Sequence, residues 1–292
     1  MFKLILLLFV VFSIAAVGSD SARQVYYQTD SLTPANIVPT FENGHLVVYD
    51  LKSASVYAPD GSLAYGIPVS ENGYIPNVAV DTNRTAAAAV DHGGSRGEIS
   101  IFDQNGLQVR LIDTGPFLPS FVCFAPDHSI WSTGTLARQS LTEKPEFFIL
   151  RHFSFDGKEL GAFLPRSSFK NDGEPAAAII GTSGLRVANN RIGALLSYGG
   201  NGSKALWVEA DLNGKEIGRW RVDIDGQPAA FTASGAIYAQ EVGHISLLDH
   251  ATGKWNPASI QSDGLLVAAD GEALVYMIRG TPSLRWVPVN RY

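Results

Sequence analysis

Short apolar runs and tight turns alternate along most of this 292-residue chain. One series of turns is built on Asn-Gly or Asp-Gly pairs: Asp60-Gly61, Asn105-Gly106, Asp156-Gly157 and Asn213-Gly214, with Thr252-Gly253 as a weaker fifth copy. Such pairs favour the type I′ turn, in which both central residues adopt positive φ. The flanking runs alternate or are continuously apolar over strand lengths, and no helical period competes with them. The pattern therefore predicts a repeated antiparallel hairpin.

A second series of turns lies between the turns of the first. It comprises Glu42–Gly44, Asp81–Arg84, Asp127–Ser129, Asn189–Arg191, Ser234-Gly235 and Asp270-Gly271. Each repeating unit then has four strands, A to D. The second series supplies the A–B turns and the first supplies the C–D turns. Because a four-strand period repeated around an axis is typical of propellers, we predict an all-β, six-bladed β-propeller with four antiparallel strands per blade.

The sixth unit ends after its third strand, Ser283–Val289. Gln24–Gln28 has the composition of a strand and no other role, so we expect this N-terminal strand to complete the last blade and close the ring. Residues 19–292 would then form one propeller domain. A β-sandwich with a second domain is the alternative, and the regular four-strand period disfavours it.

Residues 1–18 have the pattern of a secretory signal peptide. Lys3 precedes the apolar run Leu4–Val17, which is shorter than the roughly 20 residues of a membrane span. Ala16-Val17-Gly18 offers the small residues of a cleavage site before Ser19. We expect a secreted or periplasmic protein with no membrane attachment after cleavage. An uncleaved N-terminal anchor is the alternative.

Composition narrows the classes of partner. Cys123 is the single cysteine, so no internal disulfide can form, and the 46% hydrophobic content must supply the core. The formal net charge is −6 and no Lys/Arg cluster occurs, which argues against nucleic acid and anionic membranes as partners. We further expect a monomer.

The long connections all fall on one predicted face of the propeller. In this fold the D–A and B–C connections share one face, here named the long-loop face, and the A–B and C–D turns share the other. The long connections are Asp91–Gly97, Gly134–Pro145, Pro165–Thr182 and Gly199–Lys204. Insertions confined to one face are typical of a scaffold with a binding site, although surface loops also tolerate insertions without function. The candidate ligand-binding residues on this face are Asp91, His92, Arg96, Arg138, Arg166, Lys170, Asp172 and Glu174.

Catalytic motifs are absent from the sequence. No histidines are spaced as metal ligands, and no Gly-x-Ser-x-Gly elbow occurs. His128 and His250 lie in or beside turns of the short-turn face, and the tight-turn aspartates and the five tryptophans are interpreted as structural. We therefore predict a non-catalytic module, without a cofactor, that binds a protein, peptide or glycan through the long-loop face.

The segment Ala125-Pro126-Asp127-His128-Ser129-Ile130-Trp131, followed by Phe153–Lys158, resembles the six-bladed propellers of the NHL, TolB and gluconolactonase-like groups. The last group implies an alternative function, a hydrolase that uses a divalent cation such as Ca²⁺ or Mg²⁺ at the axial mouth, held by carboxylate and amide oxygens. Glu71, Asn77, Asp172 and Glu174 lie near the positions that hold the metal in that group. The motifs that surround those positions in the group are absent from this sequence.

Overall fold

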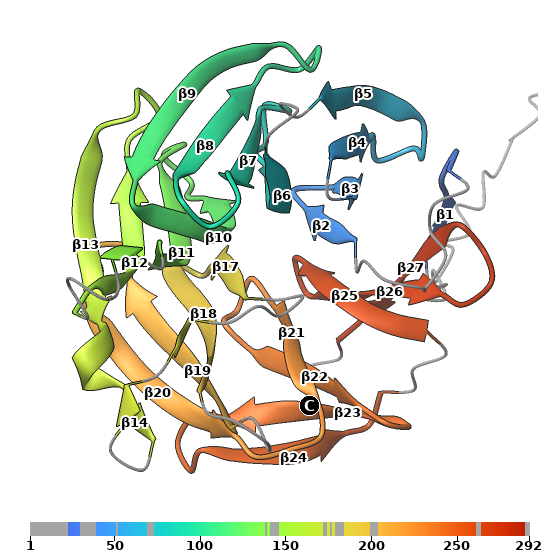
Figure 1. Cartoon of the computed structure of the whole chain (residues 1–292). Helices are drawn as coiled ribbons and strands as arrows, with labels where there is room; N and C mark the ends of the chain where they lie inside the picture. The colour runs from blue at the N-terminus through green and yellow to red at the C-terminus, as the bar shows by residue number, and fades with distance from the viewer. Residues whose placement is uncertain are drawn as a thin grey trace, which may run out of the picture.

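Six β-sheets form blades around a central axis in the computed structural model (Figure 1), and a further two-stranded sheet is separate from them. It describes residues 23–29, 39–50, 52–68, 73–137, 139–140, 146–171, 174–175, 177–178, 184–198, 204–260 and 264–289. In every sheet the strands pair antiparallel, and in five of the six blades all four strands follow the chain outward from the axis. The six-bladed propeller predicted from the sequence is therefore confirmed.

The strands of the first three blades have the following bounds. Blade 1 contains β2 (Thr40–Glu42), β3 (His45–Tyr49), β4 (Ser53–Tyr57) and β5 (Leu63–Pro68). Blade 2 contains β6 (Tyr74–Val80), β7 (Ala86–Asp91), β8 (Gly97–Phe102) and β9 (Gln108–Gly115). Blade 3 contains β10 (Phe117–Phe124), β11 (Ile130–Leu136), β12 (Phe148–Phe153) and β13 (Glu159–Pro165).

The remaining blades follow the same order. Blade 4 contains β17 (Leu185–Ala188), β18 (Arg191–Tyr198), β19 (Lys204–Asp211) and β20 (Glu216–Val222). Blade 5 contains β21 (Gln227–Phe231), β22 (Ile237–Glu241), β23 (His244–Asp249) and β24 (Lys254–Ala258). Blade 6 contains β25 (Gly264–Asp270), β26 (Ala273–Ile278), β27 (Ser283–Pro288) and the N-terminal β1 (Gln24–Tyr26).

The N-terminal strand closes the ring, as the sequence predicts. β1 pairs antiparallel with β27, with Val25 opposite Leu284. The guanidinium of Arg23 lies 4.6 Å from the centre of the Trp286 ring, and the backbone N–H of Gln28 donates to the carbonyl of Gly61 in blade 1. Blade 6 is thus completed from the other end of the chain and tied to its neighbour.

The C–D turns differ in type from the prediction. Among the described residues, only the glycine of each pair has positive φ, for example +76° at Gly106, and Asn105 does not. The N–H of Gly106 donates to the carbonyl of Asp103, and the N–H of Asp103 donates to the carbonyl of Leu107. This is a three-residue connection, a type I turn followed by a left-handed glycine in a bulge, so the type I′ prediction is wrong for these turns. The wider loop leaves room for Asp103 Oδ1 to accept the N–H groups of Asn105 and Leu107, which confirms a structural role for that aspartate.

Two of the A–B turns contain consecutive residues of positive φ instead. Asn43 and Gly44 have φ of +50° and +81°, and they join the paired residues Glu42 and His45. Two positive φ values in a two-residue hairpin are the geometry of the type I′ turn. Type I′ geometry is therefore found in an A–B turn, next to the axis, rather than in the C–D turns.

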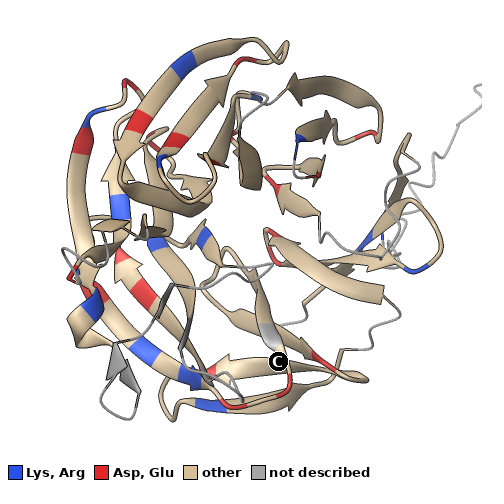
Figure 2. Ribbon diagram, in the orientation of Figure 1, with Lys and Arg blue, Asp and Glu red and all other residues tan. Residues whose placement is uncertain are grey.

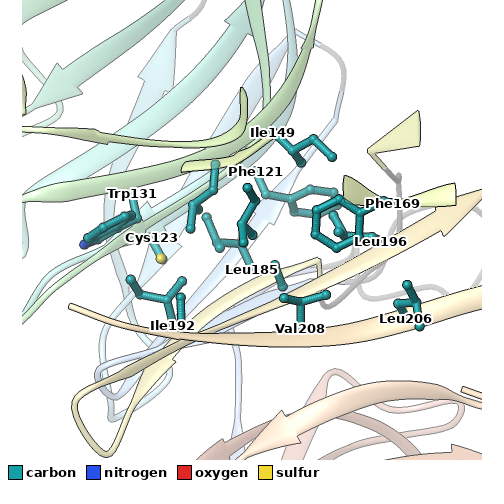
Figure 3. Packing of buried hydrophobic residues seen from close by; sticks show 14 of the residues in the cluster. Phe121, Cys123, Trp131, Ile149, Phe169, Leu185, Ile192, Leu196, Leu206 and Val208 are labelled. Atoms are coloured by element: carbon teal, nitrogen blue, oxygen red, sulfur yellow. The ribbon is translucent and has the colours of Figure 1, made fainter. Parts of the chain in front are cut away.

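The core lies between neighbouring blades rather than on the axis. Its largest cluster joins blades 3 and 4 and includes Trp131, Leu185 and Cys123 (Figure 3). Trp131 stacks on His152 with ring centres 4.0 Å apart. Trp131, Trp207, Trp255 and Trp286 are buried and Trp220 packs against a neighbouring cluster, so the interpretation of the tryptophans as packing residues is confirmed.

The long connection between blades 3 and 4 contains structure that the sequence did not predict. A short 3₁₀ helix, η1 (Arg166–Ser168), precedes β14 (Lys170–Asn171) and β15 (Glu174–Pro175), which pair with each other. β16 (Ala177–Ala178) then pairs with β18 of blade 4. Phe169 is fully buried and lies under the guanidinium of Arg219 at 4.2 Å, which anchors the start of the connection.

The predicted signal peptide lies outside the described residues. In the part of the chain that is described, no helix is both long enough and apolar enough to cross a membrane.

Candidate functional site

Three residues predicted to bind ligand, Asp91, His92 and Arg96, make contacts within blade 2. Asp91 accepts hydrogen bonds from the Tyr74 hydroxyl at 2.5 Å and from a loop N–H, that of Gly94, at 2.6 Å. His92 Nε2 lies 2.9 Å from Glu98 Oε2, and Arg96 makes a two-pronged contact with Asp113 at 3.2 and 2.8 Å. These contacts hold the β7–β8 loop in shape.

Three of the remaining predicted residues, Arg166, Lys170 and Glu174, lie in the connection between blades 3 and 4. The Arg166 guanidinium lies 5.6 Å from the centre of the Phe147 ring, and Lys170 and Glu174 belong to the β14–β15 hairpin. Arg138 and Asp172 lie outside the described residues, as does Glu71. Ligand binding by the long-loop face stays a prediction.

A cavity of about 430 Å³ lies on the axis, where the inner strands run into the A–B turns. All six blades contribute to its wall. The lining includes Glu42, Asp81, Cys123, His128, Arg186, Phe231, Ala233 and Asp270. The cavity therefore belongs to the short-turn face, and none of the predicted ligand-binding residues lines it.

An ion pair joins opposite sides of this cavity. Glu42 ends β2 of blade 1, and Arg186 lies in β17 of blade 4, so the two residues come from opposite blades of the ring. Arg186 Nη1 lies 3.2 Å from Glu42 Oε1, and both side chains are about nine-tenths buried. In Figure 2 a blue segment on β17 and a red segment on β2 border the centre of the ring, while charges of both signs are scattered over the outer strands. The pair therefore spans the axis.

Arg186 has unused donors. Its Nη1 also donates to the carbonyl of Leu185 at 2.9 Å, but Nε and Nη2 are buried without a hydrogen-bond partner. A buried donor without an acceptor costs about 1–3 kcal/mol. Because Arg186 lines the cavity, these two groups are candidates to bind an acceptor that the protein itself does not provide.

Burial raises the pKa of Glu42 to about 7, even though the nearby Arg186 charge and a backbone hydrogen bond act to lower it. Burial also raises the pKa of the adjacent Cys123 thiol, and the Glu42 charge adds to this effect. Near neutral pH the Glu42 carboxyl is thus divided between its charged and neutral forms.

The other cavity carboxylates have partners. Asp81 Oδ1 accepts the N–H groups of Asn83 and Thr85, each at 2.8 Å, and its Oδ2 lies 3.1 Å from His128 Nδ1. Asp270 Oδ2 accepts a hydrogen bond from Trp286 Nε1 at 2.9 Å. Asp81 and Asp270 therefore have hydrogen-bond partners within the protein, whereas Arg186 Nε and Nη2 have none.

The rim of the cavity is tied together from blade to blade. Asn43 Nδ2 in blade 1 donates to the carbonyl of Val80 in blade 2 at 2.7 Å. Asn189 Nδ2 in blade 4 donates to the carbonyl of Ser234 in blade 5. The backbone N–H of Ser234 donates to Glu272 of blade 6 at 2.7 Å. A cross-linked rim keeps the cavity open and its wall groups in fixed positions.

Asn77 is the one predicted cation ligand whose side chain is described. Its Oδ1 accepts the N–H of Val122 at 3.0 Å, so the amide joins blade 2 to blade 3. Among the described residues, no three His, Cys, Asp or Glu side chains are grouped so that they could hold a metal ion.

Comparison with solved structures confirms the resemblance at the level of fold. A gluconolactonase from Xanthomonas campestris superposes with a TM-score of 0.55 and 16% identity, over 91% of this chain and 89% of its own. A virginiamycin B lyase from Staphylococcus aureus superposes with a TM-score of 0.50 and 12% identity, over 92% of this chain and 99% of its own. No protein-family model and no curated protein sequence matches the chain. At these identities the likeness shows the shared propeller fold.

Sequence reasoning missed the axial residues because it assigned the short-turn face to structure alone. A signal was present: Glu42 and Arg186 are charged residues at the end of or within short apolar inner strands. Charged side chains are seldom buried unless they are paired, so such positions mark an ion pair or a site.

Proposed function

We propose that this protein is a non-catalytic binding module that receives a small ligand, or the end of a peptide or glycan chain, in the axial cavity. The supporting observation is the cavity itself. Its volume of about 430 Å³ lies within the range of about 300–1,000 Å³ that is usual for ligand sites. It also combines apolar wall groups such as Phe231 with a few polar ones, which is the usual make-up of such sites.

A blocking variant tests this proposal. Ala233 is exposed at the rim of the cavity, in the A–B turn of blade 5, and Ala251 is exposed in the C–D turn of the same blade, outside the cavity. Peptide and glycan fragments are screened by thermal shift, and hits are measured by calorimetry on Ala233→Trp and Ala251→Trp. We expect Ala233→Trp to abolish binding and Ala251→Trp to retain the wild-type Kd. Equal binding to both variants would place the ligand elsewhere.

The alternative prediction is a divalent-cation-dependent hydrolase. The fold that this chain shares with the Xanthomonas gluconolactonase supports it. Metal analysis of the purified protein, together with a lactone hydrolysis assay with and without Ca²⁺ or Mg²⁺, separates the two functions. Cation-dependent turnover would favour the hydrolase over the binding module. Loss of that turnover in Asn77→Ala, with the exposed Arg110→Gln as control, would locate it at the predicted ligands.

A further inference from the structure

The donor edge of Arg186 that lacks a partner has a defined chemistry. In this protein the Nε and Nη2 groups of two other arginines contact carboxylates in a two-pronged manner. Arg96 contacts Asp113 at 3.2 and 2.8 Å, and Arg219 contacts Glu216 at 2.6 Å through both nitrogens. Arg186 uses only Nη1 for Glu42, and its Nε and Nη2 are buried without an acceptor. Its free edge thus has the shape that matches a carboxylate.

The cavity wall also limits the charge of the ligand. Asp81 and Asp270 are engaged by donors of their own, yet their charges still face the same space as Glu42 and Arg186. Like charges disfavour a dianion there more than a single carboxylate, which Arg186 can pair with and which Glu42 repels only while it is charged. The site therefore discriminates against phosphate.

We propose that the axial cavity binds a monoanionic carboxylate, held by the Nε–Nη2 edge of Arg186 beside Glu42. This proposal rests on the proposed function and names its ligand class. Two sources carry this chemistry, the C-terminus of a short peptide and a sugar acid. Both offer a single carboxylate on an otherwise neutral framework.

Binding is coupled to a proton on Glu42, because the neutral acid no longer repels the carboxylate of the ligand. The titratable and charged groups around Glu42 come from every neighbouring element. They are His45 of β3, Asp81 after β6, Cys123 of β10, His128 in the A–B turn of blade 3, Arg186 of β17 and Asp270 of β25. With a Glu42 pKa of about 7, the neutral fraction rises about tenfold from pH 8 to pH 6, so the affinity for a carboxylate rises about tenfold over that interval.

The experiment is calorimetric titration of the purified protein with matched probes. Glucuronate is compared with glucose, and N-acetylalanine is compared with N-acetylalaninamide, so that each pair differs by the carboxylate and the two pairs distinguish the source. Inorganic phosphate at pH 8, where most of it is doubly charged, is the dianion probe. We expect one acid to bind at least about tenfold more tightly than its neutral partner and than phosphate, with uptake of a proton seen in buffers of different ionisation enthalpy.

Substitutions at Arg186 and Glu42 test whether these two residues control binding of the acid. Arg186→Gln is expected to lose at least about tenfold in affinity for the acid, and Arg110→Gln, at an exposed position of β9 outside both candidate sites, is expected to retain it within twofold. Glu42→Gln keeps a similar shape without the competing charge, so it should bind the acid more tightly at pH 8 and lose the pH dependence. This second variant keeps the test valid even if Arg186→Gln fails to fold.

Two results would overturn the carboxylate assignment. If acid and neutral probes bind equally and Ala233→Trp abolishes both, the cavity binds ligand but Arg186 does not select its charge. Acid binding that Arg186→Gln and Glu42→Gln leave unchanged would also reject it. If neither these probes nor any screened fragment depends on Ala233, the binding function itself fails.

Discussion

At the scale of single residues, Glu209 is a buried charge with three side-chain partners. It is fully buried and accepts hydrogen bonds from His250 at 2.7 Å and from Trp207 and Arg191, each at 3.0 Å. His250 belongs to blade 5, so this carboxylate also ties two blades together. Burial alone raises the pKa of Glu209, but the hydrogen bonds from His250, Trp207 and Arg191 outweigh it, and the pKa lies below its ordinary value of 4.5.

Removal of this charge should destabilise the propeller. We expect Glu209→Gln to lower the free energy of unfolding by about 1.5–3 kcal/mol, because hydrogen bonds to a buried charge are lost while Arg191 and His250, which are 36% and 30% exposed, stay partly hydrated. The control is Glu159→Gln, whose exposed pair with Arg151 contributes about 1 kcal/mol or less. Urea unfolding at pH 7 measures both. Equal losses in the two variants would contradict the role given to Glu209.

The pH dependence of the same group has a definite sign. Because the folded pKa of Glu209 is depressed, its stabilisation is present above the unfolded value of about 4.5 and is lost as the pH falls through the folded pKa. Unfolding free energies of wild type and Glu209→Gln should therefore converge as the pH is lowered from 5 to 3. A difference that stays constant over this range would show that the stabilisation does not depend on the carboxylate charge.

At the scale of elements, a glycine is required where the closing strand β1 of blade 6 contacts the C–D turn of blade 1. A Cβ built on Gly61 would lie 1.9 Å from the carbonyl oxygen of Tyr26, the last residue of β1, and φ at Gly61 is +89°. At Gly93, φ is +64° and a Cβ would meet nothing within 4 Å.

Matched alanine substitutions test this contact. We expect Gly93→Ala to cost about 1–2 kcal/mol from its left-handed backbone alone. Gly61→Ala should cost clearly more, since the backbone of the closing strand must also move. Chemical unfolding of the two variants gives the comparison, and an equal loss would mean that the Gly61 contact does not hold the ring closed.

A feature was predictable from the sequence when residues close together in the chain determine it, and was not when it depends on residues far apart in the chain. Asp103-Gln104-Asn105-Gly106 specifies its turn locally, so the hairpins, the count of blades and the closing strand were all predictable. The turn type was not, because Asn-Gly suits both the two-residue and the three-residue connection, and the register that decides between them is set by the partner strands. The axial pair was also out of reach, since Glu42 and Arg186 are 144 residues apart and meet only when opposite blades assemble.

At the scale of the whole molecule, the ring is held by its closing strand. Tyr27 is buried and packs edge-on against Tyr57 of blade 1, with ring centres 6.0 Å apart. We expect a chain that starts at Gln28 to melt about 10 °C below one that starts at Arg23, because it loses β1 and this aromatic contact. Circular dichroism melts of the two chains measure the difference. Equal melting temperatures would show that the ring does not depend on its closure.

The two faces of the propeller carry different proposals. The long-loop face remains a predicted binding surface, and its described residues Asp91, His92 and Arg96 are engaged in contacts within blade 2. The short-turn face holds the cavity, the cross-linked rim and the arginine with unused donors. The central claim is that the ligand lies on the axis at the short-turn face.

The most direct test is a crystal structure of the protein with a ligand found in the screen. The account predicts that the ligand occupies the axial cavity between β2 and β17, with an acceptor atom within about 3 Å of Arg186, the usual hydrogen-bond distance. A ligand bound instead among the long loops, near Arg96 or Arg166, with the axial cavity empty, would contradict it.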